Sequence, residues 1–345
     1  MKITLKGDVI KEFQSGLTAY DIAKEISGGL ARAACAARIN GKVCDLRTTI
    51  TEDCSLDILT FDDEDGKKAF RHTASHILAQ AVKRLFPATK LAIGPAIENG
   101  FYYDFDVEKP FSPEDIAKIE AEMKKIVKEG IALEQYELSP AEAIEYLKGI
   151  GEEYKVELCE EHAGKNEPIS FYKQGDFTDL CAGPHLMNTG AVKAVKLTNC
   201  TGAYWRGDAK GKQLCRVYGT AFPKASELEE YLKQVEEAKS RDHNKIGREL
   251  EYFTTVDYIG QGLPILLPKG AKTIQTLQRW VEDEEYKRGY ILTKTPFMAK
   301  RDLYKISGHW DHYRDGMFIM GDPDDEEKEC FALRPMTCPF QYQVY

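Results

Sequence analysis

The chain has 345 residues and a mass of 39.0 kDa, and this length predicts two or three domains. Hydrophobic residues make up 43% of the sequence and charged residues 30%, which excludes a disordered protein, and the net charge of −9 argues against indiscriminate binding of nucleic acid. No apolar run approaches the roughly 18 residues of a membrane span, and the first residues do not resemble a secretory signal. The nine cysteines form no Cys-x-x-Cys pair, so we expect free thiols in the reducing cytoplasm.

The first 61 residues predict a small β-grasp module. Its expected elements are a strand, a helix that begins with a capping box, an Asn-Gly hairpin and a closing strand, over residues 1–10, 18–28, 38–43 and 56–61. The acidic run 62–65, followed by Gly66, is the predicted boundary of this module.

Residues 62–224 are expected to form a second domain that mixes helices and strands. Two of its three predicted helices open with a Ser-Pro pair, in which proline takes the first helical position. The helices are expected over 68–86, from 112 to 130 and from 139 onward, and strands with tight loops are expected over 169–222.

The sequence pattern changes again after this second domain. Residues 225–246 predict a charged connecting helix, and residues 247–345 predict the beginning of another domain. In that domain we expect strand-like segments over 251–268 and 290–295, with a helix over 272–287 between them. The sequence stops at Tyr345 inside a pattern that has no terminating signal, so we expect it to be a fragment.

Two short patterns place histidine and cysteine side chains near one another. On the predicted helix, His72 and His76 are four residues apart and therefore lie on one face. In Asp179-Leu-Cys-Ala-Gly-Pro-His185 the Gly-Pro pair forbids a helix, so Cys181 and His185 must converge from a loop. Three histidines and one cysteine are a suitable set of zinc ligands. The alternative is that the two pairs are independent, one on a core helix and one in an ordinary loop.

The stretch 193–224 is basic and carries interleaved aromatic residues. This combination suits the backbone and the stacked bases of RNA. The candidate RNA-binding residues are Lys193, Lys196, Arg206, Lys210, Lys212 and Arg216. The alternative is a solvated face of a sheet.

Taken in chain order, these and further motifs resemble the N-terminal part of the threonyl-tRNA synthetase family, over essentially the whole sequence. The matching segments are residues 1–61 (the TGS domain of the family), His72-x-x-x-His76 with Cys181-x-x-x-His185 (its editing signature, shared with alanyl-tRNA synthetases), Asn99–Phe105, Asp179–His185, Tyr204–Asp208, Arg241–Leu250 (the start of the class II core), Thr295–Met298 (motif 1), Ser307–Asp311 and Arg334–Pro339. The last segment departs from the family in having Thr337 where asparagine is usual.

The resemblance implies an α+β multidomain fold. Its parts are a β-grasp TGS module at 1–61, an α/β editing domain at 62–224, a connecting helix at 225–246 and the start of an antiparallel-sheet class II catalytic core at 247–345.

The resemblance also implies a threonine–tRNA ligase. Such an enzyme is a cytoplasmic homodimer that forms threonyl-adenylate from threonine and ATP with Mg²⁺ and then esterifies tRNA(Thr). Met336 is expected to bind substrate, and Cys338 is expected to be one of three ligands of a Zn²⁺ ion that holds threonine. The other two zinc ligands, the ATP-binding arginines and the anticodon-binding domain are expected beyond Tyr345, so this chain is expected to retain editing only.

Editing is the second activity that the resemblance implies, namely hydrolysis of mischarged seryl-tRNA(Thr). Serine lacks only one methyl group of threonine, a difference worth about 1–3 kcal/mol, so a second pocket must remove it. The expected catalytic residues are His72, His76, Tyr103, Lys155, Asp179, Cys181 and His185. Among them, His72 and Lys155 are expected to place the attacking water and a hydroxyl of the tRNA. Asp179 and His185 are expected to position the amino acid, with Cys181 near its side chain.

Two other functions stay open on the sequence alone. Residues 67–224 could form a stand-alone deacylase that edits in trans, although the motif 1 segment argues against it. The chain could also be a non-catalytic RNA-binding module built on the TGS domain, but such a module would not need four convergent Cys and His side chains.

Overall fold

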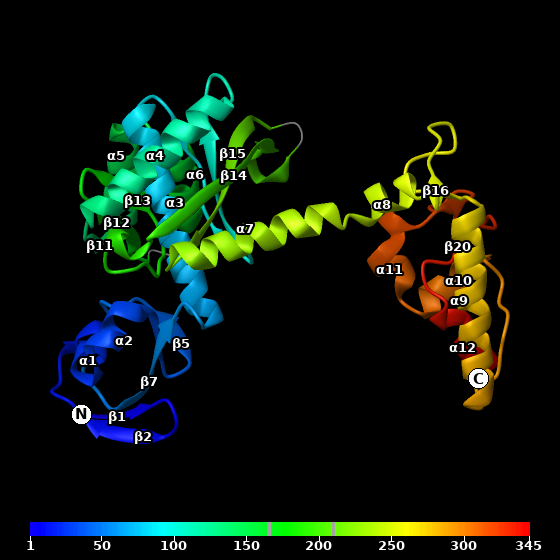
Figure 1. Cartoon of the computed structure of the whole chain (residues 1–345), viewed down its shortest axis with the longest axis horizontal. Coiled ribbons are helices and arrows are strands. Elements are labelled where there is room, and N and C mark those ends of the chain that lie inside the picture. The colour runs from blue at the N-terminus through cyan, green and yellow to red at the C-terminus, as the bar shows by residue number, and fades with distance from the viewer. Residues whose placement is uncertain (164–166, 209–210) are drawn as a thin grey trace. The chain divides into compact units, whose positions relative to one another are not determined.

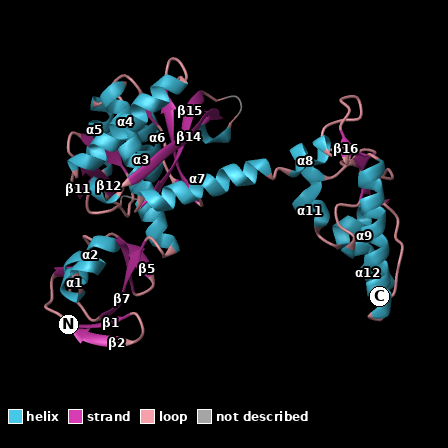
Figure 2. Ribbon diagram, viewed as in Figure 1, coloured by secondary structure: helices cyan, strands magenta, loops and turns pink. Residues whose placement is uncertain are grey.

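The computed structural model describes residues 1–163, 167–208 and 211–345. The chain divides into two compact units, Met1–Ser240 (unit 1) and Arg241–Tyr345 (unit 2) (Figure 1). Helices and strands occur in both units, as the predicted α+β class requires (Figure 2). In the part of the chain that the structure describes, no helix is long and apolar enough to cross a membrane.

The first part of unit 1 is the β-grasp module. Its sheet has the order β2-β1-β7-β4-β5, in which β1 is parallel to β7 and the other pairs are antiparallel. The elements are β1 (Lys2–Leu5), β2 (Val9–Glu12), β3 (Leu17–Thr18), α1 (Ala19–Ile26), α2 (Gly28–Ala33), β4 (Ala34–Ile39), β5 (Lys42–Cys44), β6 (Thr49–Ile50) and β7 (Cys54–Thr60).

Local sequence signals set several of these boundaries. The Thr18 hydroxyl accepts a hydrogen bond from the Asp21 N–H (3.1 Å), and the Asp21 carboxylate accepts one from the Thr18 N–H (3.2 Å), which confirms the capping box. Asn40 and Gly41 both have positive φ (48° and 82°), as a tight two-residue hairpin requires, and this confirms the predicted turn.

One local prediction for this module is wrong, and one helix is missing from the prediction. Residues 1–10 are not one strand, because Gly7 and Asp8 adopt positive φ and reverse the chain between β1 and β2. The helix that begins at Thr18 ends at Ile26, just before the predicted stop at Gly28, but a second helix, α2, was not predicted; the Ser27 hydroxyl accepts a hydrogen bond from the Leu30 N–H and begins it.

The rest of unit 1 contains two more sheets. One has the order β14-β15-β10-β8, with β9 also paired to β10, and the other has the order β11-β12-β13. The strands are β8 (Lys90–Leu91), β9 (Ala96–Ile97), β10 (Gly100–Asp106), β11 (Leu133–Leu138), β12 (Ile169–Gln174), β13 (Phe177–Leu180), β14 (Ala194–Tyr204) and β15 (Gln213–Phe222). The helices are α3 (Glu64–Leu85), α4 (Pro113–Glu129), α5 (Pro140–Gly149), α6 (Glu153–Ala163), α7 (Ala225–Ser240) and the short η1 (Thr189–Ala191) and η2 (Trp205–Gly207).

Helix α3 links the β-grasp module to these sheets. It begins at Glu64, so the acidic run 62–65 leads into the first turn of a helix, where negative charge suits the helix dipole. Ala69 and its buried neighbours on α3 share one hydrophobic core with Ala36 of the β-grasp module and Phe101 of the larger sheet. The two domains that the sequence predicts on either side of residue 62 therefore lie in one compact unit.

The Ser-Pro predictions for α4 and α5 are confirmed. Ser112 and Ser139 form capping boxes with the carboxylates three residues later, and proline is the first residue of each helix. Gly130, with a φ of 62°, ends α4 as predicted. The predicted connecting helix over 225–246 is interrupted, because α7 ends at Ser240.

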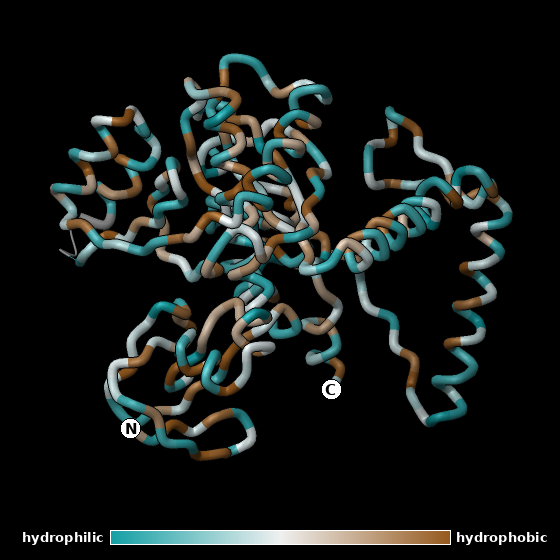
Figure 3. The backbone as a smooth tube through the Cα atoms, turned by 60° about the vertical axis from the view of Figure 1, so that its left-hand side comes forward, coloured by the Kyte–Doolittle hydropathy of each residue, from teal (hydrophilic) through white to brown (hydrophobic). Residues whose placement is uncertain are grey.

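Unit 2 contains shorter elements. They are α8 (His243–Glu249), β16 (Phe253–Thr254), β17 (Ile265–Leu266), α9 (Pro268–Lys287), β18 (Met298–Lys300), α10 (Arg301–Ile306), α11 (His309–Tyr313), η3 (Arg314–Gly316), β19 (Ile319–Met320), β20 (Phe331–Leu333) and α12 (Cys338–Val344). Strands β18, β20 and β19 form an antiparallel sheet. The predicted strand over 290–295 is wrong, because the antiparallel pairing begins only at Met298. Polar and apolar residues alternate along α9 (Figure 3), and Trp280 on this helix is 62% exposed.

Candidate active site

Helix α3 presents His72 and His76 on one face, as their spacing predicts. Residues 67–85 contain neither glycine nor proline, so the helix runs through both positions without a break. The centroids of the two imidazole rings are 5.2 Å apart. His76 is buried, whereas His72 is partly exposed.

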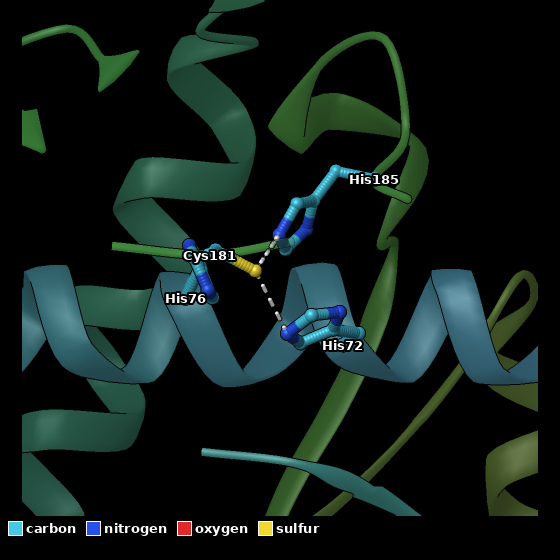
Figure 4. Close-up of side chains that lie close together, drawn as sticks. All are labelled: His72, His76, Cys181 and His185. Carbon is cyan, nitrogen blue, oxygen red and sulfur yellow. Dashed lines mark hydrogen bonds between the residues drawn. The ribbon is translucent and has the colours of Figure 1, made fainter. Parts of the chain in front are cut away.

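The loop after β13 brings two more side chains to the same place. It turns at Gly183, whose φ is 69°, and a Cβ atom at this position would collide with the hydroxyl of Tyr172. The turn directs Cys181 and His185 back toward α3. Figure 4 shows both side chains facing the two histidines of the helix.

Cys181 lies at the centre of the resulting cluster. Its Sγ atom is 3.3 Å from Nε2 of His72 and 3.2 Å from Nε2 of His185 (Figure 4). One ligand atom from each of His72, His76, Cys181 and His185 lies within 4.8 Å of the other three. The structure thus brings the two predicted pairs together, and we call these four residues the His–Cys cluster.

The tautomer of His185 follows from its contact with Thr73. The Thr73 hydroxyl donates its proton to the Ala69 carbonyl (2.9 Å) and accepts a hydrogen bond from the Leu186 N–H (2.9 Å). Because its proton is already used, it must accept from Nδ1 of His185, which is 3.2 Å away. Nδ1 of His185 therefore carries the hydrogen, and the lone pair on Nε2 points at Cys181.

Three more of the predicted catalytic residues meet around a buried ion pair. Nζ of Lys155 on α6 is 2.8 Å from Oδ1 of Asp179, and both residues are only 4% exposed. The hydroxyl of Tyr103 on β10 donates a 2.6 Å hydrogen bond to Oδ2 of Asp179. The same oxygen is 3.7 Å from Nε2 of His76, so the ion pair adjoins the His–Cys cluster.

Burial determines the protonation of the cluster. Burial lowers the pKa of His72 to about 4 and that of His76 to about 3, and it also lowers the pKa of His185. Burial raises the pKa of the Cys181 thiol to about 12. At neutral pH the cluster without a metal therefore consists of three neutral imidazoles and a protonated thiol.

Asp179 keeps its charge for a different reason. Burial alone would raise its pKa, but the ammonium group of Lys155 and the hydrogen bonds from Lys155 and Tyr103 together hold it below the usual value. The site thus holds one carboxylate and one ammonium group beside neutral imidazoles.

The donors of the His–Cys cluster fit a zinc ion. Zinc bonds of about 2.0–2.3 Å in a tetrahedral shell place the donors about 3.3–3.8 Å apart, so a largest separation of 4.8 Å requires only small movements. The hydrogen bond between Thr73 and His185 is the kind of outer contact that fixes a histidine ligand. Four protein ligands would fill a tetrahedral shell, whereas a catalytic zinc keeps one position open.

A cleft of about 290 Å³ leads to the cluster. His72 lines this cleft, as do Gly183 and Pro184 of the loop. Lys68 and Asp65 of α3 also line it and form a 3.3 Å ion pair with each other. Val43 of the β-grasp module forms part of the same wall. Of the four cluster residues, His72 is thus the one placed to meet a ligand that enters the cleft.

The candidate RNA-binding residues lie on and around β14 and β15, but four of them are engaged in ion pairs. The pairs are Lys196 with Glu120, Arg206 with Glu157 and Glu161, Lys212 with Asp106, and Arg216 with Asp104. Lys193 is exposed, and Lys210 lies outside the described residues. Any RNA phosphate at this surface would have to compete with the carboxylates of the chain.

The candidate substrate and zinc residues of unit 2 lie near α12. Met336 is half-exposed, and Cys338 is exposed at the first position of this helix. Cys338 and His309 line the same cleft of about 540 Å³. Among the described residues, however, the only group of three or more possible metal ligands is the His–Cys cluster.

Sequence reasoning missed several residues that contact this site, among them Asp45, Arg47, Thr73 and Tyr172. Thr73 lies between the two histidines of α3, so its hydroxyl is a local feature that the motif itself contains. Asp45 and Tyr172 are 127 residues apart, yet their side chains share a hydrogen bond of 2.9 Å. No pattern in a single sequence signals such a contact.

Two segments of the chain match known protein families. Residues 1–60 match the TGS domain, and residues 169–218 match the threonyl and alanyl tRNA synthetase second additional domain. The second segment includes Asp179, Cys181 and His185.

The whole chain is similar to curated proteins named threonine–tRNA ligase. It is 64% identical to those of Clostridium botulinum (strain Alaska E43 / Type E3) and Clostridium perfringens (strain 13 / Type A), and 52% identical to that of Acetivibrio thermocellus. Each comparison covers 100% of this chain and 53% of the relative, so the chain spans about half the length of these relatives. A solved structure of the RNA binding domain of threonyl-tRNA synthetase from Cryptosporidium parvum Iowa II is 32% identical, covers 30% of this chain and 25% of its own, and has a TM-score of 0.28.

Proposed function

This chain is a homologue of the threonine–tRNA ligases over all of its 345 residues, and on this premise we propose that its His–Cys cluster hydrolyses seryl-tRNA(Thr). The observation that carries the proposal is the convergence of the four cluster residues beside the buried pair of Lys155 and Asp179. The segment that holds Asp179, Cys181 and His185 matches a domain found in threonyl and alanyl tRNA synthetases, which supports an editing role.

We propose that the activity of the whole protein is the attachment of threonine to tRNA(Thr) in the cytoplasm. Its substrates would be threonine, tRNA(Thr) and ATP with Mg²⁺, and it would act as a homodimer. In that reaction Met336 would bind substrate, and Cys338 would be one ligand of a zinc ion that selects threonine.

The need for editing follows from the size of one methyl group. A site that binds threonine loses only about 1–3 kcal/mol when serine takes its place, which limits discrimination to roughly 10–200-fold. A second site that accepts serine and excludes threonine can remove the error after transfer to tRNA. The cleft beside His72 is the site that we assign to this step.

The proposed reaction is hydrolysis of an ester. A bond forms between the water oxygen and the carbonyl carbon of serine, the bond to the ribose oxygen breaks, and serine and free tRNA leave. His72 is neutral at pH 7 and lines the cleft, so its imidazole can accept a proton from the attacking water and pass it to the ribose oxygen as that oxygen leaves. We assign to Lys155 the stabilisation of the negative charge that develops on the ribose oxygen; its ammonium group is buried in the pair with Asp179 and would have to become accessible from the cleft to do so.

The other residues would position the substrate. Asp179 and His185 would orient the amino acid, and Cys181, whose thiol stays protonated without a metal, would lie beside the serine side chain. Tyr103 holds Asp179 through its hydrogen bond, and His76 lies 3.7 Å from the same carboxylate oxygen, behind His72. If the cluster bound zinc, His72, His76, Cys181 and His185 would hold it and fill its tetrahedral shell, and one of them would have to leave before the metal could polarise the ester carbonyl.

The tRNA would reach the cleft past Lys68 and along the basic stretch of β14 and β15. Because Lys196, Arg206, Lys212 and Arg216 already pair with carboxylates, phosphates must displace or share these partners. We therefore expect binding to be weak and to fall steeply as the salt concentration rises.

The test is deacylation of seryl-tRNA(Thr) by the purified chain, with threonyl-tRNA(Thr) as the matched substrate control. We expect hydrolysis of the seryl ester only. The variant His72→Ala should be slower by about 10²–10⁴-fold, the range for loss of a proton-transfer group. The variant His243→Ala, at an exposed histidine far along the sequence, should keep the full rate.

The result also separates the alternatives. A chain that binds tRNA(Thr) but hydrolyses neither ester would be an RNA-binding module, and the assignment of the cleft would be wrong. Full activity of His72→Ala would likewise contradict the role of the cluster.

A further inference from the structure

Two charged residues of the β-grasp module reach the loop that carries His185. Asp45 and Arg47 follow strand β5, and their side chains are 5% and 17% exposed. They form a 2.8 Å ion pair with each other. The loop they contact lies 140 residues later in the chain, so this is a contact between the β-grasp module and the proposed hydrolytic site.

Asp45 accepts four hydrogen bonds, and two of them come from groups next to the site. Its Oδ2 atom accepts from the backbone N–H of His185 (3.1 Å) and from the hydroxyl of Tyr172 (2.9 Å). Its Oδ1 atom accepts from the backbone N–H (2.9 Å) and the guanidinium (2.8 Å) of Arg47. Every partner is a donor, so the ionised carboxylate is the form that suits this environment.

Arg47 holds the other side of the same loop. Its guanidinium donates to the carbonyl groups of Leu186 (2.9 Å) and Met187 (3.2 Å), and its Nε–H donates to the carbonyl of Leu133 (2.9 Å). These carbonyl groups belong to the residues that follow His185 and to the start of β11. The backbone before and after the His185 side chain is therefore held from the β-grasp module.

Tyr172 links Asp45 to the His185 side chain. Its hydroxyl is held by Asp45 and lies against Gly183, and its ring centroid is 4.4 Å from that of His185 in an edge-on arrangement. Movement of Asp45 would thus weaken two contacts of His185, the hydrogen bond of its backbone N–H and the packing of its imidazole against the Tyr172 ring.

We propose that Asp45 is a positioning residue of the hydrolytic site, with Arg47 as its partner, so that the β-grasp module is a structural part of that site. The role of Asp45 is to fix the His185 peptide at the distance that lets Nε2 meet the Cys181 sulfur. Its kinetic consequence rests on the proposed function, whereas its effect on the loop does not.

The test compares Asp45→Asn with Asp57→Asn in the full chain. Both variants remove one carboxylate from the β-grasp module, but Asp57 is half-exposed and pairs with Arg38 on the same sheet. In Asp45→Asn the new side-chain amide would turn a donor toward groups that are themselves donors, so the loop should loosen.

Hydrogen exchange measured by mass spectrometry reads out the loop independently of activity. In Asp45→Asn we expect the exchange rate of the amides in segment 181–187 to rise about tenfold or more. The exchange rate of the amides that hydrogen-bond strand β4 to strand β7 should not change. In Asp57→Asn we expect no change in the segment 181–187.

Kinetics with seryl-tRNA(Thr) read out the consequence for the reaction. We expect kcat of Asp45→Asn to fall about 10–100-fold, the usual cost of losing an outer contact to a site residue, with KM changed less than about twofold. Arg47→Lys is a second, milder variant, because one ammonium group cannot reach the carbonyls of both Leu133 and Leu186, and it should change both readouts in the same direction.

Unchanged exchange in segment 181–187 of both Asp45→Asn and Arg47→Lys would overturn the inference, and so would faster exchange with an unchanged kcat. A wild-type chain that does not hydrolyse seryl-tRNA(Thr) would refute the proposed function instead. In that case the exchange measurement still decides whether Asp45 holds the loop.

Discussion

The buried ion pair between Lys155 and Asp179 makes a quantitative prediction about stability. The substitution Lys155→Met removes the ammonium group but keeps an unbranched side chain of similar length. Asp179 then stays buried with the hydrogen bond from Tyr103, and with the neutral imidazole of His76 3.7 Å away. Removing one partner of a buried pair costs about 3–5 kcal/mol, because the other charge is left uncompensated.

This loss corresponds to a large change in melting temperature. For a unit of this size each kcal/mol shifts the Tm by about 2–4 °C, so we expect Lys155→Met to melt about 6–20 °C lower near pH 7. Lys148→Met is the matched control, because Lys148 and Glu160 form a pair whose side chains are 60% and 55% exposed. An exposed pair contributes about 0–1 kcal/mol, so this variant should melt within a few degrees of the wild type.

The stability difference between Lys155→Met and the wild type should depend on pH in a defined direction. In the wild type the pKa of folded Asp179 lies below its unfolded value, so its stabilisation is present above about pH 4 and is lost as the pH falls through the folded pKa. In Lys155→Met burial is no longer opposed by the ammonium group, so the folded pKa should rise above the unfolded value. The variant therefore loses the most stability at neutral pH. The difference in melting temperature between it and the wild type should shrink as the pH falls toward about 5.

Thermal unfolding followed by circular dichroism between about pH 5 and pH 8 measures these differences. The double variant Lys155→Met/Asp179→Asn should recover part of the lost stability, because no buried charge remains. Equal melting temperatures for the single variant and the wild type would refute the argument. A deficit that is independent of pH and equally large in the double variant would show that lost packing, not the unpaired carboxylate, is responsible.

Two further predictions concern protonation and metal. The rate of seryl-tRNA(Thr) hydrolysis, corrected for the uncatalysed reaction, should not change between about pH 6 and pH 8 through titration of the cluster, because the pKa values of His72 (about 4) and Cys181 (about 12) lie outside this range. A rate that rises with an apparent pKa near 6.5 would contradict a buried His72 imidazole that is neutral at pH 7. Metal analysis of the purified chain should give the same zinc content for the wild type and Cys338→Ser, because one thiolate falls far short of the four ligands that zinc prefers. Loss of one equivalent of zinc in Cys338→Ser, but not in Cys181→Ser, would contradict this prediction.

Local chemistry explains what could be predicted from the sequence. The capping boxes at Thr18, Ser112 and Ser139 each involve residues three apart, so the sequence contains all of their atoms. The Asn40-Gly41 turn likewise depends on two adjacent residues that tolerate positive φ. The same holds for each half of the His–Cys cluster, because a spacing of four residues on a helix or across a Gly-Pro turn is a local property.

Pairing over long distances explains what could not be predicted. A strand needs a neighbour to accept its hydrogen bonds, and the apolar pattern over 290–295 does not reveal that the pairing begins only at Met298. The meeting of the His72/His76 pair with the Cys181/His185 pair depends on how the sheets pack around α3. So do the burial that keeps Cys181 protonated and the contact of Lys155 with Asp179. The hydrogen bond from the His185 N–H to Asp45 spans 140 residues, and only the tertiary structure decided that the β-grasp module would reach this loop.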